Sequence, residues 1–274
     1  MHCKICEGES KLLFDSKTTI LQRYQIHYYQ CTACQFIQTE SPYWLNEAYA
    51  SAITSLDIGL VGRNIGISRQ VSSLILSFFN KTGTFLDYGG GYGMLVRIMR
   101  DLGFDYYRYD TYCENIFAKH FDFEDSPVSK YELLTAFELF EHLDDPAAEL
   151  EKMLQLSDSV FFSTELIPNR PLSSARDWWY FTPETGQHIA LYSENALRKL
   201  AQKFNCNYYT DSHTLHLITR RKLNPLLFRL SLKSKVALMI AKAQSRKSLL
   251  QKDFDYIKNS IASNENTLRS PDLQ

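Results

Sequence analysis

The chain has 274 residues, of which 45% are hydrophobic, and a formal net charge of −1. This length accommodates one large domain with an appendage, and the apolar content excludes global disorder. The net charge by itself argues neither for nor against nucleic acid, and we expect no nucleic-acid partner.

No apolar run approaches the roughly 20 residues of a membrane span. The first residues, Met1-His2-Cys3-Lys4, lack the apolar core of a secretory signal. We therefore expect a cytoplasmic protein in a reducing compartment, where cysteines are metal ligands or free thiols rather than disulfides.

Four of the six cysteines lie in the first 34 residues as two Cys-x-x-Cys pairs, Cys3 with Cys6 and Cys31 with Cys34. This is the spacing of a four-thiolate zinc ribbon, in which each pair forms one tight turn around the metal. A closed four-sulfur site leaves no open position for chemistry, so we expect a structural Zn²⁺ in a zinc-ribbon segment at residues 1–40. The alternative is four buried thiols without a metal.

Strand and helix patterns alternate after residue 41. In chain order they are a helix at 69–79, a strand running into a glycine turn at 84–93, a helix at 92–103, strands at 105–110 and 131–139, a helix at 145–157, a strand at 158–166 and a helix at 193–204. Asp145-Pro146 marks the start of the helix at 145–157, and Ser193 is the expected N-cap of the helix at 193–204. Two further segments, 206–212 and 214–221, are expected to form a closing antiparallel hairpin. This alternation predicts a doubly wound α/β domain, which we place at residues 41–221.

The glycine turn, "DYGGGYG" (87–93), carries an acid directly before it. In a doubly wound sheet, ligands bind at such strand-to-helix turns, and glycines let the backbone approach the ligand closely. The Asp87 carboxylate would repel a pyrophosphate but attracts a sulfonium and an ammonium group. Asp110 ends the next strand, where a carboxylate can accept bonds from both ribose hydroxyls. The pair favours S-adenosylmethionine (SAM) over NAD; the alternative is a tight turn without a ligand.

With these motifs, residues 45–220 resemble the class I SAM-dependent methyltransferases. "FLDYGGGYG" (85–93) resembles their first motif, "YRYD" (107–110) the ribose-binding strand end, and "YELLTAFELFEHLDDP" (131–146) the fourth strand and following turn. The resemblance implies a Rossmann-like sheet of seven strands, and a helical lid, residues 55–64, that closes over the cofactor. The cofactor contacts that it implies are Asp87, Gly89, Gly91, Gly93, Asp110 and Phe137.

A cysteine-rich segment fused to such a domain resembles the sugar C-methyltransferases and related methyltransferases of polysaccharide and natural-product clusters. This implies that the acceptor is a sugar, a sugar nucleotide or a glycan intermediate. In the C-methyltransferases a Glu-His pair serves the proton transfer, and the corresponding pair here is Gln187-His188. Because glutamine cannot accept a proton, O- or N-methylation with a single base is as compatible with this pair as C-methylation.

Two histidines are candidates for the general base. His142 follows the fourth strand, and His188 lies in the aromatic segment 177–193. An imidazole with a free pKa of about 6.5 is suited to accept the acceptor's proton. We expect His188 to point into an acceptor pocket walled by the neighbouring side chains Trp178, Trp179, Tyr180 and Gln187. The alternative is that these rings cap the core.

The turn after the fourth strand is also compatible with binding of a divalent cation. Some quinone O-methyltransferases with a similar Glu-His turn bind a divalent cation there, so Glu138, Glu141 and His142 could hold one. The alternative enzyme is an O-methyltransferase of a small phenolic or quinone acceptor. The alternative outside catalysis is a docking module that keeps the zinc and SAM folds without turnover.

The C-terminal extension, residues 222–274, differs in composition from the domain. Residues 220–252 contain ten Lys or Arg and no Asp or Glu. Leu226, Leu230, Val236 and Met239 could form an apolar stripe on a basic helix. Such a helix either lies on a membrane surface or an acidic partner, such as a glycosyltransferase, or packs on the domain with its basic face in water.

Overall fold

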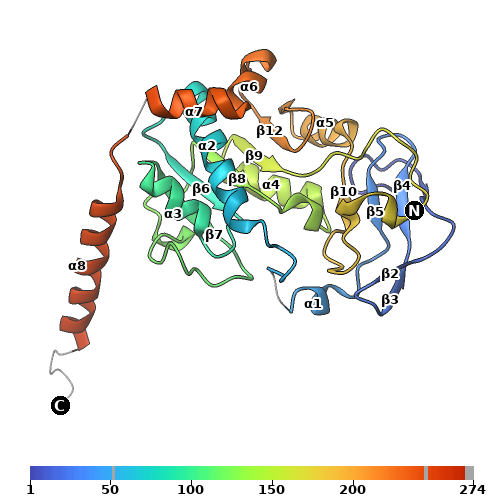
Figure 1. Cartoon of the computed structure of the whole chain (residues 1–274), viewed down its shortest axis with the longest axis horizontal. Coiled ribbons are helices and arrows are strands. Elements are labelled where there is room, and N and C mark those ends of the chain that lie inside the picture. The colour runs from blue at the N-terminus through green and yellow to red at the C-terminus, as the bar shows by residue number, and fades with distance from the viewer. Residues whose placement is uncertain (51–52, 244–245, 269–274) are drawn as a thin grey trace.

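A mixed sheet lies at the centre of the computed structural model, which describes residues 1–50, 53–243 and 246–268 (Figure 1). In spatial order its strands are β11 (Asn207–Thr210), β12 (Leu215–Thr219), β9 (Ser159–Ser163), β8 (Leu133–Ala136), β6 (Thr84–Tyr88) and β7 (Asp105–Tyr109). Strands β7, β6, β8 and β9 are parallel, and β12 and β11 add an antiparallel hairpin. The predicted α/β class and closing hairpin are confirmed.

The chain leaves the middle of the sheet in two opposite directions. From β6 it passes through α3 (Met94–Asp101) to β7, and from β8 through α4 (Pro146–Leu156) to β9. Because parallel crossovers are right-handed, the opposite directions place α3 and α4 on opposite faces and open a crevice at the carboxyl ends of β6 and β8. Helix α2 (Leu60–Phe78) packs beside α3, and α5 (Glu194–Lys203) packs on β11.

The seven-stranded sheet predicted from sequence is one strand too large for the described residues. Next to β7, where an outer strand would lie, Arg108 and Asp122 form only a single bridge. The chain instead makes a 3-10 turn, η1 (Phe123–Asp125), in which Asp125 accepts a bond from the Asp122 backbone at 3.0 Å. Asp side chains compete with strand ladders for backbone N–H groups, so this acidic segment turns rather than extends.

The N-terminal segment forms small antiparallel sheets. Its strands are β1 (Ser10–Leu12), β2 (Thr18–Ile20), β3 (Tyr24–Ile26), β4 (Tyr28–Cys31) and β5 (Ile37–Thr39). Strands β1, β4 and β5 pair in that order, and β2 pairs with β3. A distant strand, β10 (Ala190–Leu191), pairs with β5. The segment that was expected to be an appendage therefore shares a sheet with residues that follow β9.

A second apolar core fills the space between this N-terminal module and the segment before β10. Turns η3 (Ala175–Asp177) and η4 (Trp179–Phe181) supply rings from the later segment. The Phe181 ring lies 4.8 Å from that of Tyr28, edge to face, and 5.6 Å from that of Phe14. The core contains Phe14, Ile20, Ile26, Tyr28, Ile37, Trp44, Trp178, Tyr180, Phe181, Ile189 and Leu191. Much of the aromatic segment is thus committed to packing.

Side-chain caps define where the helices begin. Asp145 Oδ1 accepts bonds from the backbone N–H groups of the first turn of α4, with Pro146 at the first helical position. Ser193 Oγ accepts a bond from Ala196 N at 3.0 Å and caps α5. Both caps were predicted from sequence, and both are confirmed.

The C-terminal residues form three helices, α6 (Pro225–Leu232), α7 (Ser234–Ala243) and α8 (Leu250–Leu268). The first two pack on α2, whereas α8 projects away from the body of the molecule (Figure 1). Residues 244–245 and 269–274 of the predicted extension lie outside the described residues. A search of the described helices finds none with the length and apolar character needed to cross a membrane.

Candidate active site

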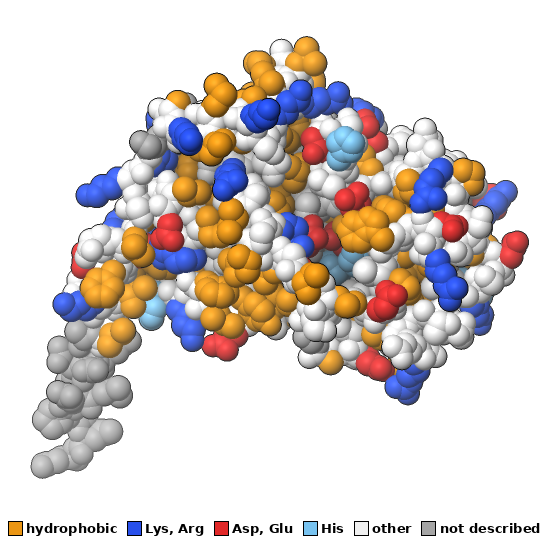
Figure 2. Space-filling model, in the orientation of Figure 1, with side chains coloured by type: hydrophobic (Ala, Val, Ile, Leu, Met, Phe, Trp, Pro, Cys, Tyr) orange, Lys and Arg blue, Asp and Glu red, His pale blue; other side chains and the backbone are white. Residues whose placement is uncertain are grey.

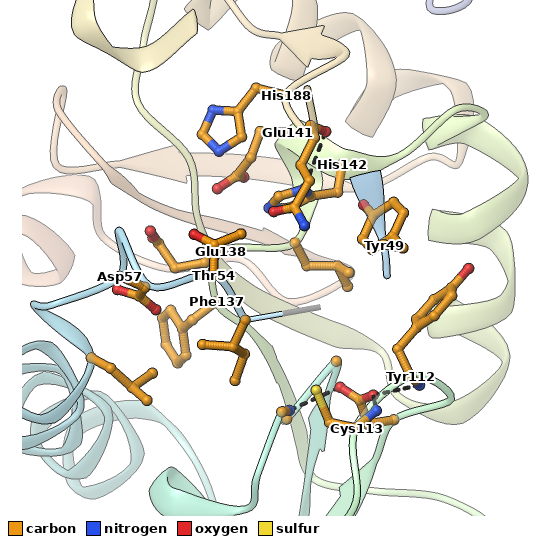
Figure 3. A pocket seen from close by; sticks show the side chains of 18 of the residues that line it. Tyr49, Thr54, Asp57, Tyr112, Cys113, Phe137, Glu138, Glu141, His142 and His188 are labelled. Atoms are coloured by element: carbon orange, nitrogen blue, oxygen red, sulfur yellow. Dashed lines mark hydrogen bonds between the residues drawn. The ribbon is translucent and has the colours of Figure 1, made fainter. Parts of the chain in front are cut away.

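A cleft of about 850 Å³ lies at the carboxyl ends of β6, β7 and β8 (Figure 3). It occupies the crevice that the sheet topology creates. The parts of the chain that line it are α1 (Leu45–Ala48), the start of α2, the glycine turn, the turn η2 (Phe140–His142), and residues in the segment 179–188. The cleft is therefore bounded by the sheet on one side and by residues tied to the N-terminal module on the other.

The glycine turn has a backbone that only glycine adopts easily. Gly89 and Gly91 have φ angles of +72° and +53°, in the left-handed region. A Cβ at Gly91 would lie 3.4 Å from Ile53, and one at Gly89 would lie 3.1 Å from Leu139. The turn consequently presents bare backbone to the cleft, as a ligand that must approach closely requires.

Gly93 lies at the start of α3 rather than in the wall of the cleft. It is the left-handed N-cap of α3, with φ +83°. A Cβ there would lie 2.6 Å from Asn115 Oδ1. The residue permits the turn to enter the helix, so we keep it out of the direct cofactor contacts.

Asp110 is anchored at the edge of the cleft. Its Oδ2 accepts a bond from Gly91 N at 2.9 Å, and its Oδ1 accepts bonds from Tyr112 N and Cys113 N, both at 2.8 Å. A carboxylate offers about four lone-pair sites, so capacity for a hydroxyl of a ligand remains. The three backbone bonds hold the group in one orientation, which suits recognition of a ribose.

Asp87 lies deeper, behind the turn. Its Oδ1 accepts a bond from Thr135 Oγ1 at 2.7 Å. Burial, with the charge of Asp110, raises its pKa to about 7. A cation placed in the cleft would favour the ionised form of Asp87. Phe137, the remaining predicted cofactor residue, follows β8 and lines the same cleft.

His142 and His188 meet on the other side of the cleft. Their ring centroids lie 5.0 Å apart with the planes at 89°. His142 Nδ1 lies 3.2 Å from the Gln187 carbonyl and His188 Nδ1 lies 2.6 Å from the Tyr180 carbonyl. Because a carbonyl can only accept, each Nδ1 carries the proton and each Nε2 is left as an acceptor.

Burial keeps both rings neutral. It lowers the pKa of His142 to about 3, with a further contribution from His188, and lowers the pKa of His188 to about 4. Both imidazoles are therefore unprotonated at neutral pH. The geometry brings together the two bases that the sequence left as alternatives.

Glu141 lies beside these histidines and is fully buried (Figure 3). Burial, with the charge of Glu138, raises its pKa to about 8. Among the described residues, neither of its carboxyl oxygens has a hydrogen-bond partner. Ligand atoms of Glu141, His142 and His188 lie within 4.8 Å of one another, so this group could hold a cation.

The predicted acceptor residues separate into two sets. Trp179 is 68% exposed at the cleft, and Tyr180 and Gln187 also line it. The Gln187 side chain donates from Nε2 to the Ala48 carbonyl at 2.8 Å. Trp178 is only 7% exposed and packs in the second core, so we drop it from the acceptor contacts.

Sequence reasoning missed part of the cleft wall. The Arg63 guanidinium bonds to both oxygens of Asp57 at 2.8 and 2.9 Å and lies 3.7 Å from Glu138 Oε2. Tyr49 and Tyr112 stack with centroids 5.1 Å apart. Arg63 and Asp57 fall in or beside the predicted lid and could have been noticed as charges there. Nothing local in the sequence marks the two tyrosines.

The four N-terminal cysteines converge on one point, away from the cleft. Cys3 Sγ lies 3.5 Å from Cys34 Sγ, and Cys6 Sγ lies 3.6 Å from Cys31 Sγ. All four sulfurs lie within 4.8 Å of one another. A tetrahedral zinc ion with bonds of about 2.3 Å separates its sulfurs by about 3.8 Å, so the cluster fits such an ion.

A mixed α/β sheet with a glycine turn after one strand and an acid, Asp110, at the end of the neighbouring strand is the arrangement expected of the class I SAM-dependent methyltransferases. The chain belongs to a methyltransferase domain family, whose model matches residues 64–210. No curated protein matches the chain.

Several solved methyltransferase structures are similar to this chain at low identity. The plantazolicin methyltransferase BpumL is 13% identical, with a TM-score of 0.45 over 65% of this chain and 93% of that chain. An O-methyltransferase family 2 protein from Planctomyces limnophilus is 13% identical, with a TM-score of 0.45 over 64% and 66%. CalO1, a methyltransferase of calicheamicin biosynthesis, is 12% identical, with a TM-score of 0.41 over 57% and 54%. The chain thus spans about half the length of CalO1.

Proposed function

We propose that this SAM-dependent methyltransferase methylates a sugar, a sugar nucleotide or a glycan intermediate, and that His188 accepts the proton that the acceptor loses. The observation that carries the proposal is the pair of neighbouring imidazole rings, His142 and His188, which lie 5.0 Å apart and line the same cleft as the glycine turn. Their neutral state at neutral pH matches the requirement of a general base.

The glycine turn and Asp110 are proposed to hold the cofactor. SAM, when bound, supplies a methyl group on a sulfonium. The bare backbone at Gly89 and Gly91 would approach it closely, and Asp110 would accept bonds from the ribose hydroxyls. Asp87 would complement its positive charge. Holding both reactants in line can contribute roughly 7–11 kcal/mol to the lowering of the barrier.

His188 is the better placed of the two bases. Burial lowers the pKa of both rings, and the neighbouring His188 adds to the lowering at His142. Its 2.6 Å bond to the Tyr180 carbonyl fixes the ring and stabilises the imidazolium that forms. Gln187 contributes no second base, since its amide is bonded to the Ala48 carbonyl, which favours an acceptor that loses only one proton.

The wall of the cleft supports a polyhydroxylated acceptor. Arg63, Asp57 and Glu138 offer charged donors and acceptors, and Trp179 offers an exposed ring on which a sugar could stack. A basic amphipathic segment and a sugar-active cleft are also compatible with glycan biosynthesis, as the sequence resemblance implies.

The proposal is tested with purified enzyme, SAM and two panels of acceptors, sugar nucleotides and catechols, with products measured by mass spectrometry. We expect a mass increase of one methylene on a sugar nucleotide. Turnover confined to catechols would reject the sugar acceptor and leave the methyltransferase intact. The same assay with added Mg²⁺ or Mn²⁺ checks His188, because strict dependence on the cation would make Glu141, His142 and His188 ligands rather than bases.

A further inference from the structure

Helices α6 and α7 expose apolar side chains along one edge of the molecule. Leu226 is 75% exposed and Met239 is 69% exposed, and Leu227, Leu230 and Leu238 are exposed as well. Val236, which the sequence suggested for an apolar stripe, is half-buried instead. We call the five exposed residues the apolar edge: Leu226, Leu227, Leu230, Leu238 and Met239.

The opposite face of these helices is fixed to the domain. Phe228 and Ala237 are fully buried, and α7 packs along α2. Ser73 Oγ of α2 donates to the Ser231 carbonyl at 2.7 Å, and Gln70 Nε2 donates to the Leu232 carbonyl at 3.2 Å. The apolar edge is therefore presented by a rigid support and is not a frayed tail.

Basic side chains surround the apolar edge. Exposed cations on or beside the two helices are Lys222, Arg229, Lys233, Lys235 and Lys242. In the sequence, residues 220–252 contain no acid. Within the described residues, no ion pair engages any of these five cations. Figure 2 shows hydrophobic and basic side chains intermixed along the upper edge, where Figure 1 places α6 and α7.

We propose that α6 and α7 dock the enzyme on an anionic membrane surface. Apolar side chains that project from a helix enter the boundary between headgroups and acyl chains, while lysines and arginines beside them contact anionic headgroups. Both features are present here on one rigid edge. A lipid surface also removes from water the apolar area of an exposed patch that cations surround. The inference is independent of the acceptor.

The test is co-sedimentation of the full chain with vesicles of phosphatidylcholine alone or with 30% phosphatidylglycerol. We expect binding to the anionic vesicles, at least tenfold weaker binding to the neutral vesicles, and loss of binding in high salt, because salt screens the cations. Two variants address the two components: Leu226→Ser with Met239→Ser removes apolar contacts, and Lys233→Glu with Lys235→Glu reverses charge. Each should lower the bound fraction at least fivefold.

A matched control removes the same residue types elsewhere. Leu12→Ser with Lys17→Glu alters exposed residues of the N-terminal module and should bind vesicles like the parent. Affinity for SAM, measured by calorimetry, should be unchanged in all three variants, which shows that they fold. Equal binding of parent and edge variants would overturn the proposal. So would equal binding to neutral and anionic vesicles, or preference for a soluble acidic protein over vesicles.

Discussion

The histidines of the cleft owe their state to what surrounds each ring. Both rings donate Nδ1–H to a backbone carbonyl. The second core and the turn after β8 shield both rings from solvent. Burial disfavours the imidazolium, so each ring is a neutral acceptor without the aid of a partner carboxylate. At neutral pH such a ring stays neutral until it accepts a proton from the acceptor during the reaction.

Replacing His188 should separate catalysis from cofactor binding. In His188→Ala we expect turnover to fall roughly 100- to 10,000-fold, because the variant lacks the general base that accepts the acceptor's proton. Affinity for SAM should stay within about twofold, since the glycine turn and Asp110 are untouched. Single-turnover kinetics and calorimetry measure the two quantities. His213→Ala, at an exposed position outside the cleft, is the control, and equal rates for both variants would remove His188 from the mechanism.

A third buried histidine makes the fold sensitive to acid. Burial lowers the pKa of His216 to about 4, whereas the unfolded chain titrates near about 6.5. Below pH 6.5 the unfolded state therefore binds the proton first, and stability is lost as the pH falls toward 4. At pH 5 this one group costs about 2 kcal/mol of unfolding free energy.

His216→Gln should be less stable than the parent at pH 7, because His216 Nε2 and Nδ1 bond to Thr164 and Thr210. Its loss of stability between pH 7 and pH 5 should nevertheless be smaller than the parent's by about 2 kcal/mol, since glutamine does not titrate. Urea unfolding at the two pH values gives both numbers. His213→Gln serves as the exposed control, and identical slopes for the parent and His216→Gln would contradict the assignment.

At the scale of elements, strand β10 connects the cysteine cluster to the cleft. It pairs with β5 directly after His188, and the Ser193 hydroxyl that caps α5 donates to the Cys34 carbonyl at 2.5 Å. Just after this module, Trp44 Nε1 donates to the Gly186 carbonyl at 2.8 Å. The side of the cleft that contains His142 and His188 is therefore built against the N-terminal module, while the side that contains the glycine turn is built on the central sheet.

Loss of the cysteine cluster should disturb only the side of the cleft that contains His188. In Cys31→Ser we expect weakened hydrogen-exchange protection at residues 188–191 and loss of methyl transfer, because structural zinc binding contributes folding energy directly. SAM affinity should stay within about threefold. Cys206→Ser, a buried cysteine outside the cluster, is the control. Unchanged protection at 188–191 would show that the module folds without its metal.

The features that could be predicted from the sequence are those that depend on local signals. The glycine turn at 87–93 and the caps Asp145 and Ser193 each depend on residues a few positions apart, and the structure contains them as expected. The pairing of β10 with β5 joins segments from opposite ends of the chain through a strand of two residues. So short a strand has no periodicity to read, which is why the shared sheet was not predicted.

The predicted site residues also divide into those whose positions follow from local signals and those whose positions depend on packing between distant segments. Asp87 and Asp110 follow from their positions at strand ends, where the fold class fixes their location. The approach of His188 to His142, and the withdrawal of Trp178 into the second core, depend on packing between the N-terminal module and the segment before β10. Aromatic residues alone do not reveal which rings face a ligand and which face each other.

At the scale of the whole molecule, a buried carboxylate, Asp253, ties the start of helix α8 to two arginines of α3. Asp253 accepts bonds from Arg100 Nη2 at 2.7 Å and Arg100 Nε at 2.9 Å, and Arg97 Nη2 adds a third at 2.9 Å. Both Asp253 and Arg100 are buried. Ile257 also packs against the core, and the Tyr256 ring lies 6.0 Å from that of Phe121. Most other side chains from 250 to 261 are exposed, so we expect the buried ion pair to govern whether the helix stays on the domain.

Asp253→Ala should release α8 and destabilise the domain. Removing one partner of a buried pair leaves the other charge uncompensated, and here Asp105, 2.7 Å from Arg100 Nη1, retains part of the compensation. We therefore expect a loss on the order of 3 kcal/mol, the lower end of the usual range. Urea unfolding measures the loss, and limited trypsin digestion should cut faster at Lys252 and Lys258. Asp255→Ala, an exposed neighbour on α8, provides the comparison; if both variants unfold and digest alike, the buried pair does not hold the helix.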